Sequence, residues 1–463
     1  MTIWIPTLID TPVPKYKALA DAIGEAIDEG ELSPGDKLPT HRQLADALSV
    51  TVGTITRGYA EAERRQLIES KVGSGTFVKL PKSSSSFTIQ ESEDPNIIDL
   101  SYSIALYQGQ DELMQDSLMS ISQDKPLMRR LLSYQPETGM LHHREAAQAW
   151  LEQTGIRTTD ADRMIITNGG QHGFFSVTQA ICRAGDTVLS AGLTYPGFSG
   201  VARQMGLKHI GLEHDNAGIL PEAMRVACQR HQPRALYLNT RLNNPTSDVM
   251  TLERIHAIAE ICQQYKIWVI EDDVQGCLNI PSTPCFANEY PDMTFLVSST
   301  SKAISGGLRV GYIQPPDTLS RPVANAVKAS CWMAAPLMVE LASRWILSGK
   351  TQSLADARRE ELKDRHKIVN EKLNEFSFYS TDTGFNVWLH LPEERRAQEF
   401  TGALSQQNVL VKPYNAFAVG HFNAPQAIRF CIAGNNSRER LQKSLEIISN
   451  ELKNNTVDLD YMQ

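Results

Sequence analysis

The sequence contains no long apolar run and no regular cysteine pattern. A membrane-spanning helix needs about 20 consecutive, mainly apolar residues, so the sequence predicts no membrane segment. Asp10 and three early prolines interrupt any signal-peptide pattern at the N-terminus, which predicts a cytoplasmic protein. The seven cysteines lack C-x-x-C spacing, and their odd number favours buried thiols over a disulfide framework.

Positive charge is also scarce. The 463 residues include 45 lysines and arginines against 53 aspartates and glutamates, giving a formal net charge of −8. Bulk charge therefore does not favour binding to a polyanion, and any contact with nucleic acid must come from a local surface. With 41% hydrophobic and 21% charged residues the composition is that of a globular protein, and the length favours two or three domains.

Residues 1–80 have the pattern of a separate small domain. Apolar residues recur at helical spacing over residues 16–27, which predicts an amphipathic helix. Thr40 and Gln43 have capping-box spacing before a second short helix, and a third begins near residue 51. Two short helices joined by a tight turn predict a helix-turn-helix. The glycine-containing segment 67–79 predicts a β-hairpin, or wing.

Residues 97–455 alternate strand-like and helix-like segments, which predicts an α/β fold. The Ser-rich segment 81–96 is typical of a flexible linker, and the polar residues 456–463 are interpreted as a tail. Near-continuous apolar character suits strands that are buried on both faces, and ligands of such sheets lie beyond the strand carboxyl ends. The predicted strands are 165–167, 187–190, 235–238, 267–270 and 294–298.

The most informative stretch is residues 298–311, Ser-Ser-Thr-Ser-Lys-Ala-Ile-Ser-Gly-Gly-Leu-Arg-Val-Gly. Ser299, Ser301 and backbone N–H groups can donate to an anion, and Arg309 can form a two-pronged bond to a phosphate. Lys302 supplies a primary amine beside this anion site. An amine next to a phosphate seat suits an aldehyde cofactor with a phosphate handle. These residues therefore predict pyridoxal 5′-phosphate, held as a Schiff base on Lys302.

Other candidates follow the predicted strands. The glycines of Asn168-Gly-Gly-Gln171 precede a helix, a pattern that can seat a phosphate on backbone N–H groups. A carboxylate at the pyridine nitrogen would make the cofactor ring an electron sink, and Asp272 and Asp273, after the fourth predicted strand, are the candidates; the family resemblance described below favours Asp272. Asp273 is the rival, and one of the two is expected to be a structural or solvated acid.

Segment 298–311 resembles the cofactor-lysine motif of fold-type-I aminotransferases, and other segments match that family in the same order. The resemblance implies a mostly parallel central sheet with a smaller C-terminal α/β domain, and catalytic roles for Lys302 and Asp272. It further assigns Gly170 and Gln171 to the phosphate, Tyr195 to the pyridine ring, Asn244 to the 3′-oxygen, Tyr134 to the neighbouring subunit's phosphate and Arg429 to the substrate carboxylate. Two departures from the family pattern are Gln275, where relatives commonly have tyrosine, and residues 104–107, where a Gly-x-Pro is expected.

Residues 12–79 resemble the winged helix of GntR-type repressors, through Leu38-Pro-Thr-His-Arg-Gln-Leu-Ala45 and the segments near residues 51–57 and 73–78. In that family the third helix enters the major groove of DNA and the wing approaches the minor groove. The resemblance implies DNA contacts by Arg42, Thr51, Thr54 and Arg57 in the helices and by Lys71, Gly73 and Ser74 in the wing. A small protein-binding winged helix is the alternative that charge alone leaves open.

Together the two segments resemble the MocR subfamily of GntR regulators. This resemblance implies a cytoplasmic homodimer that binds a double-stranded DNA operator and senses pyridoxal phosphate or a small amino compound. The alternative is a working aminotransferase whose winged helix is incidental or autoregulatory, and a cofactor-free relic is disfavoured by the intact Lys302 and Arg309. We predict no metal site, and His142 and His143 are interpreted as unpaired surface or core histidines.

Overall fold

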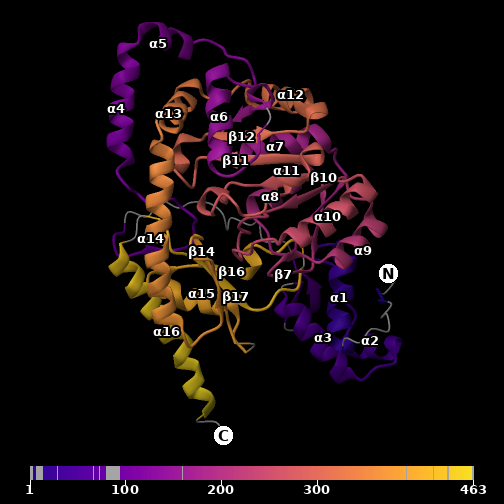
Figure 1. The fold of residues 1–463 in the computed structure, drawn as a ribbon. Coiled ribbons are helices and arrows are strands. Elements are labelled where there is room, and N and C mark those ends of the chain that lie inside the picture. Colours follow the sequence, from indigo (N-terminus) through magenta and orange to yellow (C-terminus); the bar gives the residue numbers. More distant parts are fainter. Residues whose placement is uncertain are drawn as a thin grey trace. The chain divides into compact units, whose positions relative to one another are not determined.

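A computed structural model describes residues 4–6, 14–28, 30–65, 67–71, 73–79, 94–158, 160–392, 394–420, 422–434 and 437–460. The chain divides into two compact units, one containing residues 14–79 and a larger one containing most of the residues from 94 onward. Figure 1 shows the elements of both units along the chain. The predicted linker lies outside the described residues as far as residue 93.

The first unit is a winged helix. Its elements are α1 (Lys15–Asp28), α2 (His41–Leu48), α3 (Val52–Arg64) and an antiparallel hairpin of β1 (Ile68–Lys71) and β2 (Gly75–Val78). The predicted capping box starts α2, because Thr40 Oγ1 accepts from the Gln43 N–H and Gln43 Oε1 accepts from the Thr40 N–H. Leu19 and Ile23 of α1 are fully buried in a core shared with α3, which confirms the predicted apolar face.

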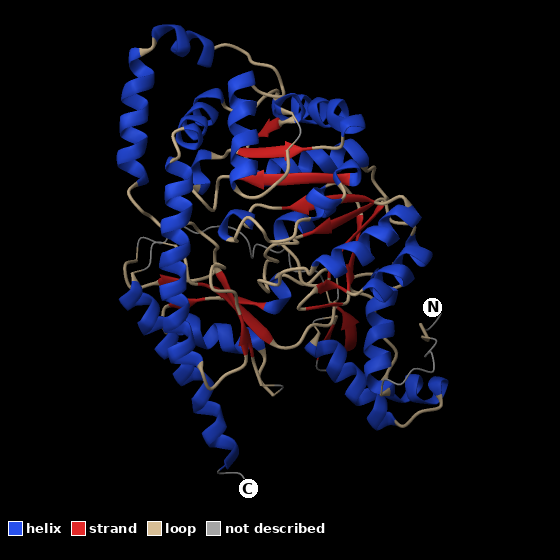
Figure 2. Ribbon diagram, in the orientation of Figure 1, coloured by secondary structure: helices blue, strands red, loops and turns tan. Residues whose placement is uncertain are grey.

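The larger unit is built on a seven-stranded sheet (Figure 2). In spatial order its strands are β4 (Ile165–Thr167), β12 (Gly311–Gln314), β11 (Thr294–Ser299), β10 (Trp268–Asp272), β9 (Ala235–Leu238), β5 (Thr187–Ala191) and β6 (Lys208–Leu212). Only β12 is antiparallel to its neighbours. All five predicted strands are present. Sequence reasoning missed β6 and β12, because lysine, histidine, glycine and glutamine interrupt their apolar pattern.

Helices cover both faces of this sheet. One face packs against α7 (Gly170–Ile181), α8 (Pro196–Gln204) and α12 (Ser320–Cys331), and the other against α9 (Pro221–His231), α10 (Leu252–Tyr265) and α11 (Phe286–Glu289). Along β9, Ala235 and Tyr237 belong to the first core, whereas Leu236 and Leu238 belong to the second. This two-residue alternation directs Tyr237 toward the side of α7. The parallel strands β10 and β11 place their carboxyl ends at one edge.

A smaller antiparallel sheet forms the predicted C-terminal α/β part. Its strands are β13 (Phe378–Tyr379), β14 (Asn386–His390), β17 (Ala427–Cys431) and β16 (Lys412–Pro413). Two further pairs are β3 (Ile98–Asp99) with β15 (Val409–Leu410), and β7 (His214–Asp215) with β8 (Gly218–Ile219). The helix α16 spans Arg438–Asp460. It therefore includes residues 456–460, which the sequence assigned to the tail.

The remaining helices are α4 (Gln110–Gln123), α5 (Lys125–Leu131), α6 (Leu141–Gln153), α13 (Pro336–Leu347), α14 (Lys350–Leu373) and α15 (Ala397–Gln406). Figure 1 shows α14 as a long helix that runs from the region of the large sheet to the region of the small one. Within the described residues, none of the helices combines the length and apolarity that crossing a membrane requires.

Candidate cofactor site

An anion seat lies where β4 leads into α7. Gly169 has a φ of +81°, and a Cβ at this position would collide with the guanidinium of Arg309. Arg309 Nη2 donates to the carbonyl of Asn168 at 3.2 Å. The guanidinium therefore lies beside the first turn of α7, where backbone N–H groups and the helix dipole favour a negative charge. Gly170 begins this turn and is also tightly placed, since a Cβ there would come within 2.7 Å of Val274.

One polar side chain next to this seat is incompletely satisfied. Ser299 ends β11, and its Oγ is hydrogen-bonded to the Oγ of Ser301 at 2.6 Å. Gln171 Nε2 donates to the carbonyl of Gly197 at 2.8 Å, but its Oε1 is buried without a partner among the described residues. Buried polar atoms normally have hydrogen-bond partners, so this group indicates a site that is completed by a ligand.

Lys302 lies in the turn after β11, with its Nζ donating to the carbonyl of Ser103. Burial lowers the pKa of the Lys302 ammonium below its ordinary value, and the nearby Arg429 guanidinium lowers this pKa as well. Cys431 and Asp272 act in the opposite direction. A lowered pKa increases the fraction of neutral amine at physiological pH, which is the form that reacts with an aldehyde.

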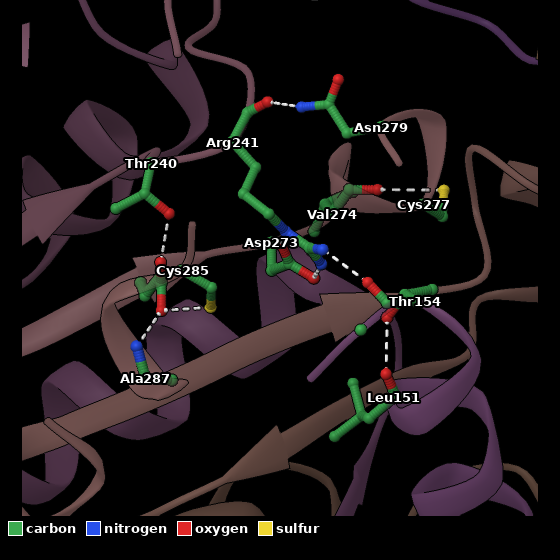
Figure 3. Close-up of polar contacts among 12 residues, drawn as sticks. Leu151, Thr154, Thr240, Arg241, Asp273, Val274, Cys277, Asn279, Cys285 and Ala287 are labelled. Carbon is green, nitrogen blue, oxygen red and sulfur yellow. Dashed lines mark hydrogen bonds and ion pairs between the residues drawn. The ribbon is translucent and has the colours of Figure 1, made fainter. Parts of the chain in front are cut away.

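Asp272 and Asp273 are neighbours in sequence but have different partners. Arg241 binds Asp273 with both ends of its fork, with Nε–Oδ1 at 2.7 Å and Nη2–Oδ2 at 2.5 Å, and donates to the carbonyl of Thr154 at 2.5 Å (Figure 3). Both side chains are almost fully buried. Asp273 is therefore the structural acid of the two.

Asp272 accepts instead from the hydroxyl of Tyr237 and from the Val274 N–H at 3.0 Å. Burial raises the pKa of Asp272 to about 6, although these hydrogen bonds oppose the rise. In the described residues no cation lies within ion-pair distance of this carboxylate. Sequence reasoning missed Tyr237. The available signal was a tyrosine inside an apolar strand, since a buried phenol needs a hydrogen-bond partner.

Glu271, on the other side of Asp272 in sequence, belongs with the closed cluster. It is fully buried and accepts from the backbone N–H groups of Phe286 at 2.8 Å and Ala287 at 2.7 Å, and from the hydroxyl of Thr240. The Sγ of Cys285 also lies 3.2 Å from Glu271 Oε2, and Figure 3 shows Thr240, Cys285 and Ala287 beside the Arg241–Asp273 pair. Every oxygen of Glu271 and Asp273 has a donor, so these carboxylates have no free position for a ligand.

Arg429 occupies the middle of β17 and is almost fully buried. Its Nη1 donates to Ser103 Oγ at 3.0 Å and to Asn386 Oδ1 at 3.3 Å, and its Nη2 donates to the carbonyl of Ser101. Its Nε has no partner in the described structure, and no described carboxylate forms an ion pair with it. Burial lowers the pKa of Arg429 to about 10. A buried guanidinium without an anion favours a negatively charged ligand.

Residues 101–106 form a strap that occupies both cationic groups. Ser101 and Ser103 bind Arg429, and the Ser103 carbonyl also binds Lys302. Arg358 of α14, another fully buried arginine, donates to the carbonyls of Lys302 at 2.5 Å and Leu106 at 2.6 Å. Sequence reasoning missed Arg358, which carries no motif and is recognisable only from its burial. A ligand carboxylate that binds the Nη groups of Arg429 would compete with these strap oxygens.

Three other residues were predicted to contact the cofactor: Asn244, Tyr195 and Tyr134. Asn244 is buried, and its Oδ1 has no partner among the described residues. Tyr195 precedes α8, and burial raises the pKa of its phenol to about 12, with further contributions from Asp272 and, in the opposite direction, Arg309. Tyr134 is 81% exposed and its ring centroid lies 5.7 Å from that of Trp332, so it does not touch the site of its own chain.

The winged helix presents its predicted DNA contacts on the surface. Arg42 and Arg57 are exposed on α2 and α3, and Lys71, Gly73 and Ser74 are exposed in the wing. Thr51 and Thr54 also have a local role, because Thr51 Oγ1 accepts from the Thr54 N–H at 3.3 Å and caps α3. Val52, at the start of α3, is an apolar residue that is also exposed.

Comparison with known proteins agrees with this arrangement. Residues 95–448 match the family described as aminotransferase class I and II. The chain belongs to this family. Residues 15–78 match the family of bacterial regulatory proteins named gntR. A gntR winged helix followed by an aminotransferase domain is the predicted MocR arrangement.

Relatives share this order of domains or the fold of the larger unit. An HTH-type transcriptional regulator of Bacillus subtilis, YdeF, is 28% identical over 96% of this chain and 96% of its own length. Mouse mitochondrial kynurenine/alpha-aminoadipate aminotransferase is 26% identical over 47% of this chain and 57% of its own length. An archaeal alanine:glyoxylate aminotransferase structure covers 77% of this chain and 91% of its own, with a TM-score of 0.71 and 20% identity.

A second solved structure is LysN, an alpha-aminoadipate aminotransferase from Thermus thermophilus in complex with N-(5′-phosphopyridoxyl)-L-leucine. It covers 78% of this chain and 92% of its own, with a TM-score of 0.70 and 19% identity. Family membership supports pyridoxal 5′-phosphate as the cofactor. The residues also fit it, because the glycine turn beside Arg309 suits a phosphate, and Asn244 and Gln171 retain unsatisfied polar atoms.

Proposed function

We propose that this chain is a pyridoxal-phosphate-binding transcriptional regulator of the MocR type, which binds DNA through its winged helix. The observation that carries this proposal is the combination, in one chain, of a winged helix with Arg42 and Arg57 exposed and an aminotransferase domain in which Lys302 follows an anion seat. Relatives that share both parts over nearly their full length are named transcriptional regulators.

The proposed sensor function follows from the chemistry of the site. Pyridoxal phosphate, when bound, supplies an aldehyde that condenses with a primary amine and a pyridine ring that accepts electrons. Lys302 would hold the aldehyde carbon, and Arg309, Gly170, Gln171, Ser299 and Ser301 would hold the phosphate. Asp272 would face the pyridine nitrogen, with Tyr195 and Asn244 along the ring.

The effector is proposed to be a small amino compound with a carboxylate. Its amine would compete with the Lys302 amine, and its carboxylate would replace the strap oxygens at Arg429. Release of the strap would then change the state of the larger unit, and the two ligand-dependent states would differ in DNA affinity.

A homodimer is part of the proposal. Leu132, Tyr134 and Trp332 are 84%, 81% and 52% exposed, an unusual degree for large apolar side chains of one region. A symmetric partner would cover them and bring Tyr134 to the neighbouring phosphate, as the family resemblance implies. Two winged helices in one dimer would read paired half-sites.

The cofactor assignment is tested by replacing the lysine. Purified protein with pyridoxal phosphate should show a visible absorbance band that borohydride fixes covalently, and Lys302→Ala should abolish the fixed label. Lys328→Ala removes an exposed lysine of α12 and should leave the band unchanged. Covalent labelling that survives in Lys302→Ala would reject the assignment.

The DNA-binding assignment is tested on a promoter fragment that the full-length protein protects from nuclease. Arg42→Ala removes one phosphate-contacting charge and should weaken binding while reducing the slope of log K against log salt by about 1. Repeating the titration with pyridoxal phosphate and candidate amino acids would identify the effector. Unchanged affinity in Arg42→Ala would exclude this residue from the interface.

A working aminotransferase is the second candidate, and the intact Lys302 and Arg429 favour it. In that case the freed Lys302 amine would move the α-proton of an amino acid held by Arg429. Transamination at roughly one turnover per second or faster, within the ordinary range of enzymes, would favour this second function. Turnover far below that range with intact effector-dependent DNA binding would favour the regulator.

A further inference from the structure

A second polar cluster lies away from the cofactor site, between α6 and α13. His142 Nε2 and His143 Nε2 lie 2.8 Å and 3.0 Å from the same oxygen, Oε2 of Glu340. The interpretation of these histidines as unpaired was wrong, because the acid that pairs them comes from a helix almost 200 residues later in the chain. Consecutive histidines on a helix rarely point at one atom, and here their ring centroids are 4.1 Å apart.

The three ligand atoms have nearly the spacing of a metal site. They lie within 4.8 Å of one another. A tetrahedral zinc ion with bonds of about 2.0–2.1 Å separates its ligand atoms by about 3.3 Å. Around such an ion the nitrogen–oxygen distances of 2.8 Å and 3.0 Å would widen by a few tenths of an ångström, and the two imidazole nitrogens, which lie within 4.8 Å of each other, would adopt the same spacing. His142 is partly exposed, whereas His143 and Glu340 are buried.

The types of donor suit a transition-metal ion, because imidazole nitrogens and carboxylate oxygens are ligands that zinc binds. Burial lowers the pKa of His143, although its hydrogen bond to Glu340 opposes the change. Burial alone would raise the pKa of Glu340, but hydrogen bonds from His143, Arg344 and His142 hold this pKa well below its ordinary value.

The second oxygen of Glu340 is already oriented. Arg344 Nε, one turn later on α13, donates to Oε1 at 2.8 Å, and Arg344 Nη1 donates to Ser120 Oγ at 3.0 Å. Such an outer contact fixes the direction of a carboxylate ligand and leaves Oε2 toward the histidines. The guanidinium charge also opposes a cation, so the expected affinity is moderate.

We propose that His142, His143 and Glu340 form a binding site for a divalent transition-metal ion, with zinc as the best fit to two imidazoles and one carboxylate. The ion would join the start of α6 to α13. Both helices border a cavity lined by Gln135, Gly139, Met140, His143 and Val339. The first of these residues, Gln135, directly follows the exposed Tyr134 in the sequence. This inference does not depend on the proposed regulatory function.

The test is zinc titration of full-length, tag-free protein that has been loaded with pyridoxal phosphate, reduced with borohydride and freed of metal with a chelator. Calorimetry should show one zinc per chain, and zinc should raise the melting temperature. Cobalt in the same site should give the absorption of a tetrahedral ion. Removing one ligand in His142→Ala should weaken binding by at least about tenfold. Because His142 is partly exposed, this variant is expected to fold.

Two further variants sharpen the result. Glu340→Gln keeps the size of the ligand but removes its charge, and should also weaken zinc binding by at least about tenfold. His256→Ala is the matched control, because His256 is also a helical histidine with one side-chain partner, the hydroxyl of Tyr290 at 2.8 Å. Absence of saturable zinc binding, or equal affinity in the parent and His142→Ala, would overturn the proposal.

Discussion

Two groups of charged side chains lie at the carboxyl end of β10, and they differ in how completely they are paired. Arg241, Asp273 and Glu271 form a closed cluster in which each carboxylate oxygen has a donor. Across the strand end, Lys302 and Arg429 have no anion within ion-pair distance among the described residues and are held by neutral oxygens of the strap.

This difference separates carboxylates with a structural role from those that can bind a ligand. A charge that is buried with its own counter-charge is structural, because its interactions are complete without a ligand. A buried charge that has only neutral hydrogen-bond partners retains the capacity to bind a ligand of opposite charge. Asp272 and Asp273 are adjacent, yet they fall on opposite sides of this division. Asp273 binds Arg241, whereas Asp272 accepts from the Tyr237 hydroxyl and the Val274 N–H.

Breaking the closed cluster should have the largest effect. Arg241→Met leaves Asp273 buried without a partner, and we expect a loss of about 3–5 kcal/mol in the free energy of unfolding. The double variant Arg241→Met/Asp273→Leu removes both charges and should recover much of the loss. Urea denaturation of the cofactor-free protein measures both. A loss below about 1 kcal/mol in the single variant would show that the pair is not the structural member of the comparison.

Exchanging the carboxylate of Asp272 should give a smaller effect whose sign depends on pH. Because burial raises the pKa of Asp272 to about 6, the folded protein binds this proton more tightly than the unfolded chain. The stability that this group contributes is present below about pH 4 and is lost as the pH rises through about 6. Asp272→Asn should therefore stabilise the cofactor-free protein by up to about 3 kcal/mol at pH 7.5, and by little near pH 4.

The same substitution should weaken binding of pyridoxal phosphate at pH 7.5, since the pyridine nitrogen loses its carboxylate. Asp273→Asn is the matched comparison, because it breaks the pair with Arg241 and should destabilise the protein at pH 7.5. Urea unfolding at both pH values and cofactor titration measure these outcomes. If Asp272→Asn and Asp273→Asn behave alike, the assignment of separate roles to the two acids is wrong.

Lys302 and Arg429, which we call the open cluster, were candidates from the sequence, whereas Arg241 and Glu271 were not. Lys302 and Asp272 stand in short segments at strand ends that match the motifs of a known family, so the resemblance could propose roles for them. Arg241 and Glu271 carry no motif, and their partners, Asp273 apart, come from distant segments such as residues 151–154 and 285–287. For the same reason the pairing of His142 and His143 with Glu340 was invisible, because it depends on how α6 packs against α13.

Weakening the contact between the strap and Arg429 should have the smallest effect of these substitutions. Ser103 Oγ accepts from Arg429 and donates to Asn386 Oδ1 at 2.7 Å, so Ser103→Ala removes one neutral contact from the guanidinium. One net hydrogen bond amounts to about 0.5–1.5 kcal/mol, and we expect amino acids to bind about 2- to 10-fold more tightly, measured from the visible spectrum of the cofactor. Tyr107→Phe alters an exposed residue next to the same strap, whose hydroxyl donates to Asp111, and should change nothing at the site. Weaker binding in Ser103→Ala would show that this hydroxyl helps to hold the ligand carboxylate instead of competing with it, and the open cluster would then include the strap as part of the binding site.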